Sequence, residues 1–155
     1  MTILTKIMTS VLIFAMGLMV FVVTWQIFTR FILNDPSLYS EEMAGFLLIW
    51  IGMLGSVYAL ITKSHIGIDI LTKNLKGKEK TISIFMIYSL IILFSLSVLV
   101  IGGSRLVHLT FSLNQISPAL GIKMSYIYLV IPLSGILIII YSIDIIRKTI
   151  MKSIN

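Results

Sequence analysis

Residues 30–59 read RFILNDPSLYSEEMAGFLLIWIGMLGSVYA, and this stretch decides the fold. Two apolar runs meet here across a short polar turn, and the second run opens with the adjacent carboxylates Glu41 and Glu42. Such a pair at the start of a membrane-length helix must stay hydrated or find partners, because burying an unpaired charge is costly. The pair therefore caps a helix or provides a docking site for another molecule.

The composition places the chain in a class before any motif is considered. Of its 155 residues, 58% are hydrophobic and 12% are charged, a balance that excludes an ordinary soluble domain and predicts an integral membrane protein. The chain has no cysteine, which excludes disulfides, Cys-based zinc sites, iron–sulfur clusters and covalently attached haem. We interpret the net charge of +6 as a signal of membrane topology rather than of nucleic-acid binding.

Working outward from residues 30–59, the sequence contains four apolar runs of membrane length. About 20 apolar residues in a helix cross a hydrocarbon core of roughly 30 Å. The sequence therefore predicts an all-α, single-domain integral membrane protein with four transmembrane helices, at about residues 7–29, 43–62, 82–104 and 124–146. The first run lacks a small-residue cleavage site at its end, so we expect a retained helix rather than a signal peptide.

Local signals predict how these helices begin, bend and end. Asn34–Ser37 has the composition of a turn, and Ser40 is expected to cap the second helix. The third run stays apolar past Arg105, which predicts a helix that protrudes from the bilayer. Pro132 and Gly135 predict a local kink in the fourth run.

The segment of residues 63–81 is the most basic part of the chain. Ile68, Leu71 and Leu75 could share one helical face there, which would make a short interfacial helix. With four spans, the two termini and this segment share one side and hold nine Lys and Arg residues, against three on the other side. Because basic residues are enriched on the cytoplasmic side, we expect cytoplasmic termini and an outward-facing glutamate pair.

No candidate site for catalysis or cofactor binding stands out. None of the predicted span centres contains an ionisable side chain, which argues against a stand-alone ion-coupled transporter. His65 and His108 fall at opposite membrane faces and cannot ligate one haem iron; His65 instead has Asp69 four residues away, where the two can pair. No cofactor and no enzymatic activity are expected. A redox-enzyme membrane anchor and a small independent transporter or channel stay as alternatives.

Two groups of residues are candidates for partner contacts. In the second span, Gly52 with Ser56 and Gly55 with Ala59 form small-residue pairs four apart, which let another helix approach closely. Outside the membrane, Glu41 and Glu42 are free to cap their helix, to pair with Arg30 or Arg105, or to steer a basic partner.

Several ordered motifs together carry a family resemblance. They are Arg30-Phe31 with Asn34 and Pro36, Ser40-Glu41-Glu42 ahead of Trp50 and Gly55, His65-Ile66-Gly67-Ile68-Asp69, Ser117-Pro118-Ala119-Leu120-Gly121-Ile122 before Met124, and Tyr128 with Pro132 and Gly135. In these motifs, and over nearly its whole length, the chain resembles the small membrane subunit of tripartite ATP-independent periplasmic (TRAP) transporters, the DctQ-like family. Lys123 departs from the family, which often has proline there.

This resemblance implies a partner rather than an activity. It implies a non-catalytic scaffold subunit in the bacterial inner membrane, assembled with a large multi-span TRAP subunit and a periplasmic substrate-binding protein for sodium-coupled uptake of small organic acids. The residues expected at partner interfaces are Arg30, Glu41, Glu42, Trp50, Gly52, Gly55, Ala59, His65, Asp69, Ser117 and Pro118.

Overall fold

The computed structural model describes residues 3–62 and 78–154, and within them the chain is helical apart from its connecting loops. The elements in order are α1 (Ile3–Phe31), α2 (Leu38–Ile61), α4 (Lys78–Phe94), the π-helix η1 (Ser95–Gly102), α5 (Gly103–Ser112), α6 (Met124–Tyr128) and α7 (Val130–Ile154). In this part of the chain, four helices are long and apolar enough to cross a membrane. The predicted all-α fold with four transmembrane helices is confirmed.

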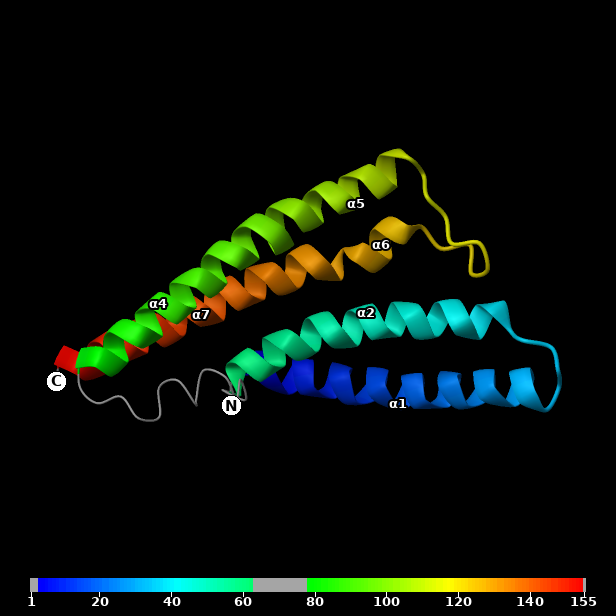
Figure 1. Ribbon diagram of the computed structural model, residues 1–155, viewed down its shortest axis with the longest axis horizontal. Helices are drawn as coiled ribbons and strands as arrows, with labels where there is room; N and C mark the ends of the chain where they lie inside the picture. The colour runs from blue at the N-terminus through cyan, green and yellow to red at the C-terminus, as the bar shows by residue number, and fades with distance from the viewer. Residues whose placement is uncertain (1–2, 63–77, 155) are drawn as a thin grey trace.

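The spans form two helical hairpins that meet along α7 (Figure 1). One hairpin is α1 with α2; the other pairs the long α4–η1–α5 rod with α6 and α7. Among the described elements, the backbone of α1 comes close to that of α2 alone, whereas the backbone of α7 comes close to α2, α4, η1, α5 and α6. The described ends of the chain lie toward the same side of the molecule, with the end of α7 farther out than the start of α1, and this side is here called the termini end (Figure 1). The loops of residues 32–37 and 113–123 lie at the other, the loop end.

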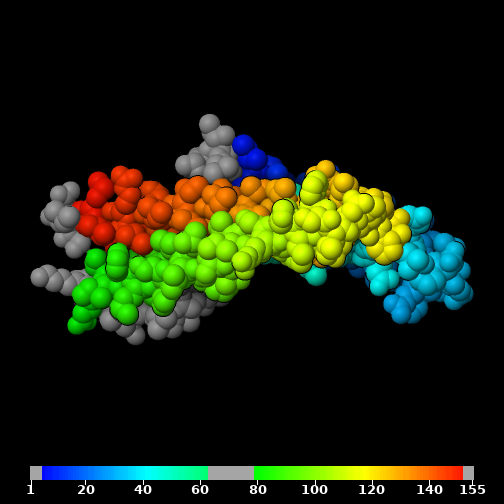
Figure 2. Space-filling model, turned by 90° about the horizontal axis from the view of Figure 1, so that it is seen from above, coloured from blue at the N-terminus to red at the C-terminus, as the bar shows by residue number. Residues whose placement is uncertain are grey.

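The third span is longer than a bilayer requires. It runs from Glu79 to Ser112 as 34 helical residues. At 1.5 Å per residue this is about 51 Å, against a hydrocarbon core of roughly 30 Å. Figure 2 shows this rod, green to yellow, lying along the orange and red α7 for much of its length. Even at the largest usual tilt the rod is longer than the hydrocarbon core, and the position of Arg105 and His108 predicts that the last turns of α5 extend past the core at the loop end.

Apolar side chains from all four spans meet toward the termini end. Met8, Val57, Leu60, Tyr88 and Ile138 are buried together there, and they come from α1, α2, α4 and α7. In lipid this cluster is held by close packing, because surrounding acyl chains are as apolar as the side chains themselves.

Two glycines allow η1 and α5 to pack very closely against α7, because neither glycine has a side chain to keep the helices apart. A Cβ placed on Gly135 would lie 2.7 Å from Leu99 Cβ and 3.3 Å from the Val100 backbone nitrogen. A Cβ on Gly103 would lie 2.9 Å from Ile131 Cγ2 and 3.1 Å from Pro132 Cδ. These are the tight helix crossings of the described structure, and both lie within the second hairpin.

The fourth span is interrupted where a kink was expected. A turn at Leu129 separates α6 from α7. Pro132 follows three residues later; it has no N–H to donate to the Tyr128 carbonyl, and its ring crowds that carbonyl. One backbone hydrogen bond of the helix is therefore missing at the junction of α6 and α7.

The start of α2 differs from the prediction. The helix begins at Leu38, its N-cap is Ser37, and the side chain of Ser37 makes no capping hydrogen bond. Ser40 lies inside the first turn, where its hydroxyl donates to the Ser37 carbonyl at 2.9 Å. The prediction that Ser40 caps the helix is therefore wrong, because the helix starts earlier than the acidic pair suggested. The predicted interfacial helix, with His65 and Asp69, lies outside the described residues.

Candidate functional site

Glu42 joins the two hairpins at the loop end. Its carboxylate accepts the Ser117 hydroxyl and the backbone N–H groups of Ala119 and Leu120, both at 3.1 Å. The Ser117 hydroxyl oxygen also accepts the Leu120 N–H at 3.2 Å. Hydrogen bonds to an ionised carboxylate are stronger than those between neutral groups. We call this set of contacts the Glu42 clamp.

The loop that binds Glu42 has a defined conformation of its own. Asn114, at φ 48°, ends α5, and the chain then folds back through an isolated antiparallel bridge between Ile116 and Lys123. Inside the bridge, the Ser117 N–H donates to the Ile122 carbonyl at 2.9 Å and the Gly121 N–H to the Ser117 carbonyl at 3.0 Å. Gly121 has φ +67°, a conformation that side-chain-bearing residues seldom adopt. The tight turn leaves two adjacent amides pointing at Glu42.

The turn before α6 keeps its conformation although Lys123 stands where the family often has proline. Lys123 is the N-cap residue of α6, with φ −64° and ψ 124°. That φ is the value that a proline ring enforces, so lysine adopts here the backbone conformation that proline would have. Its ammonium group also lies 5.2 Å from the centre of the Phe111 ring, a distance that allows a cation–π interaction between α5 and the start of α6.

Glu41 and Glu42 have different surroundings although they are adjacent. Glu41 is exposed, whereas Glu42 is half-buried by the loop that it binds. Arg30 and Arg105 are exposed, and neither forms an ion pair with Glu41 or Glu42 in the described part of the chain. Neither predicted arginine pair is therefore present among the described residues, whereas Glu41 lies in the first turn of α2, where its charge suits the positive end of the helix dipole. Glu42 is engaged within the chain, and Glu41 is left facing solvent.

Of the other predicted interface residues, Ser117 is brought to Glu42, while Pro118 is exposed beside it. Gly52 is exposed, and a Cβ on Gly52 or Gly55 would find no atom within 4 Å. Ala59 and Trp50 are half-buried on the same helix. No other part of the described chain therefore packs closely against Gly52 or Gly55.

Sequence reasoning missed the residues that make the close contacts. It identified Glu42 and Ser117 separately but not their pairing, because they lie 75 residues apart and nothing local connects them. It also missed Gly103, although a Gly-Gly pair in an apolar run is a signal for close helix packing.

Comparison with known proteins agrees with the resemblance seen in the motifs. Residues 19–151 match the family model of the DctQ component of tripartite ATP-independent periplasmic transporters. That range covers most of the chain.

Three curated relatives were found. The sialic acid TRAP transporter small permease protein SiaQ of Vibrio cholerae is 29% identical over 129 residues, which cover 83% of this chain and 73% of SiaQ. The C4-dicarboxylate TRAP transporter small permease protein DctQ of Rhodobacter capsulatus is 26% identical over 97 residues, 63% of this chain and 42% of DctQ. The isethionate TRAP transporter permease protein DctMQ of Oleidesulfovibrio alaskensis is 30% identical over 121 residues, 74% of this chain but only 19% of DctMQ.

These relatives are transporter permease subunits, and they give no support to a redox-enzyme anchor. With four membrane-length helices, the chain is a multi-pass protein of the bacterial inner membrane and not an enzyme. In DctMQ the matching region is a small part of a much longer permease chain, which agrees with a role beside a large permease subunit. The chain belongs to the DctQ component family and is a small permease subunit of a TRAP transporter.

Proposed function

We propose that this chain is the non-catalytic scaffold subunit of a sodium-coupled TRAP transporter that takes up a small organic acid. The relatives' names refer to sialic acid, C4-dicarboxylates and isethionate, all of them small acids. This range supports the substrate class and leaves the individual solute open.

The observation that carries the scaffold role is the distribution of charge along the spans. No Asp, Glu, Lys, Arg or His lies between Lys6 and Arg30, between Glu42 and Thr62, between Lys80 and Arg105, or between Lys123 and Asp144. Ion-coupled transporters keep ionisable groups at membrane depth despite their insertion cost of at least about 2.5 kcal/mol. Asp144, at the edge of the fourth span, is bound to Lys148 at 2.6 Å. The coupling chemistry is therefore assigned to the large subunit.

The exposed groups at the loop end support docking of a periplasmic substrate-binding protein there. Glu41 and Asp35 are exposed carboxylates at this end, and Arg30 is an exposed cation. Charges on the rim of an interface steer a partner and set its orientation. Because Glu42 is already bound within the chain, we assign the recognition role to Glu41 and the structural role to Glu42.

The open small-residue face of α2 supports contact with the large subunit. Gly45 and Gly52 are exposed and lie seven residues apart, so they fall on one face of the helix. No described atom would lie within 4 Å of a Cβ at either position. A helix of another chain could approach this face closely.

The test is uptake by cells or proteoliposomes that contain the large subunit and the binding protein, with and without this chain. We expect uptake to require the chain and a sodium gradient. A Glu41→Lys variant should weaken binding-protein docking, with a higher binding-protein concentration needed for half-maximal uptake. As a matched control, Lys148→Glu at the termini end should leave that concentration unchanged. Full uptake without this chain would contradict the scaffold role, and unchanged docking in Glu41→Lys would contradict the assignment of Glu41.

A further inference from the structure

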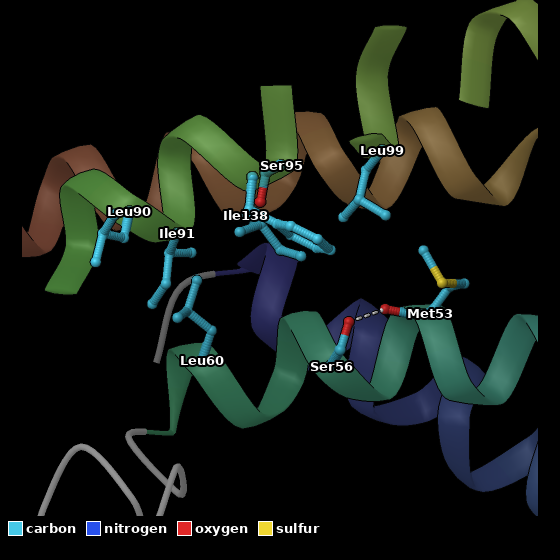
Figure 3. Close-up of a pocket in the computed structure, with 9 residues that line it drawn as sticks. Met53, Ser56, Leu60, Leu90, Ile91, Ser95, Leu99 and Ile138 are labelled. Carbon is cyan, nitrogen blue, oxygen red and sulfur yellow. Dashed lines mark hydrogen bonds between the residues drawn. The ribbon is translucent and has the colours of Figure 1, made fainter. Parts of the chain in front are cut away.

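A lateral groove lies between the two hairpins. It has a volume of about 560 Å³, within the roughly 300–1,000 Å³ typical of ligand pockets. Apart from two serines, its lining is apolar: Met53, Ser56, Leu60, Leu90, Ile91, Phe94, Ser95, Leu99 and Ile138. Figure 3 shows these side chains reaching into one space from three ribbons, α2 below, α4 with η1 above, and α7 behind.

The groove exists because α2 and the α4–η1 segment both pack closely on α7 while their own backbones stay apart in the described structure. Side chains of α2 and α4, among them Leu60 and Tyr88, still meet in the buried cluster at the termini end. Where they face each other the lining includes the small side chains of Ser56 and Ser95. The Ser56 hydroxyl is bound to the Met53 carbonyl of its own helix at 2.7 Å, so it offers little to a polar ligand.

The groove lies at membrane depth. Its lining spans Leu90 to Leu99 along the third span, nine residues or about 13 Å. Met53, Leu99 and Ile138 are each at least six residues from the nearest charged residue in the sequence, or about 9 Å along a helix. Half of the hydrocarbon core is about 15 Å thick, so the groove has nearly the length of the acyl region of one leaflet.

These dimensions favour a lipid chain over a protein helix. A transmembrane helix from another subunit runs the full core, roughly 30 Å, and packs on small residues. The groove is half that length, and the exposed glycines of α2, Gly45 and Gly52, do not line it. The groove is open rather than enclosed, and it opens between apolar membrane-length helices. An unfilled space there would forfeit dispersion contacts on every side.

We propose that this groove is a binding site for one acyl chain of a bilayer phospholipid, held between the two hairpins. The chain would fill the space over Ile138 and between Leu60 and Leu99. It would connect the hairpins directly beside the apolar cluster of the termini end, which shares Leu60 and Ile138 with the lining of the groove. This inference rests on the membrane location of the chain and not on its proposed transport role.

Site-specific photocrosslinking in the assembled transporter tests the proposal. A diazirine amino acid replaces Met53, which lines the groove, or Leu48, which is 59% exposed on the same helix and lies outside it. The complex is purified through detergent washing, irradiated, and analysed by mass spectrometry of the intact chain. We expect a phospholipid adduct at position 53 that survives washing, and loss of most adducts at position 48.

A pair of serine variants tests whether the groove itself holds the lipid. Ser56→Leu fills the groove, whereas Ser97→Leu changes an exposed serine of η1 whose hydroxyl also bonds to its own helix, at 2.8 Å to Leu93. Ser56→Leu should remove most of the adduct at position 53, and Ser97→Leu should retain it. A covalent product with another protein at position 53, equal labelling at positions 48 and 53 after washing, or no lipid adduct at position 53 would each overturn the proposal.

Discussion

Glu42 accepts hydrogen bonds from Ser117, Ala119 and Leu120, whereas Glu41 beside it is exposed. A substitution of both carboxylates together would therefore mix two effects, the loss of an internal contact and the loss of a surface charge. Single substitutions separate them. Because a carboxylate offers only acceptors, it matches three converging donors, and an amide of the same shape does not.

We predict that Glu42→Gln loosens the 113–123 loop. The glutamine NH₂ group would face a backbone N–H or the Ser117 hydroxyl where the carboxylate accepted a bond. Amide hydrogen exchange at Ala119 and Leu120 should become faster by about tenfold or more, because hydrogen bonds to a charged acceptor are lost. Glu41→Gln is the matched control and should leave exchange at these amides unchanged. Equal exchange in wild type and Glu42→Gln would contradict the clamp.

Which of two adjacent glutamates binds the loop could not be read from the sequence. The acidic pair itself was evident, and so was the turn at residues 117–122. Their contact depends on the rotation of α2 about its own axis and on the angle at which the second hairpin packs against it. Both are properties of tertiary packing. The Ser40 prediction failed because Ser37 and Ser40 are both of a residue type that favours the N-cap, and the helix begins after Ser37.

At the scale of elements, η1 crosses α7 closely at Gly135, where an added Cβ would have less room than at any other described glycine, and we predict that Gly135→Ala destabilises this crossing. The new methyl group would lie 2.7 Å from Leu99 Cβ. Inserting a group into a close-packed site typically costs about 1–3 kcal/mol. Thermal unfolding of the purified chain, followed by tryptophan fluorescence, should show a lower midpoint. Gly52→Ala, at a position with nothing within 4 Å, should not lower it.

The same pair of variants distinguishes internal from external packing. If the α2 glycine face contacts the large subunit, Gly52→Ala should weaken co-purification of that subunit while the isolated chain keeps its stability. Normal co-purification with Gly52→Ala would contradict this assignment. The sequence predicted close helix packing at the glycines of α2. The spacing of small residues does not determine whether that face of the helix is directed into the subunit or away from it. The structure places the internal close contacts at Gly103 and Gly135 instead.

For the whole molecule, long uncharged runs were sufficient to predict four membrane helices, because the bilayer imposes both their length and their apolar character. They could not predict the groove, the π-helix or the central position of α7. Those features depend on which helices touch, and acyl chains give no preference for one apolar face over another.

The orientation in the membrane is a prediction that the absence of cysteine makes simple to check. We expect Asp35→Cys, at the loop end, to react with a membrane-impermeant maleimide from the periplasmic side. Met151→Cys, 66% exposed near the termini end, should react only after the inner membrane is opened. The basic residues of the termini end require this arrangement under the positive-inside rule. The reverse labelling pattern would contradict it.

The central claim is that this chain supports transport but does not itself move a solute. The most direct test is reconstitution of the purified chain alone into proteoliposomes with a sodium gradient and a labelled small organic acid. A matched sample contains the large subunit and the binding protein as well. The charge-free span centres predict no uptake above protein-free vesicles for the chain alone, and sodium-dependent uptake in the complete sample. Sodium-dependent uptake by the chain alone would contradict the account.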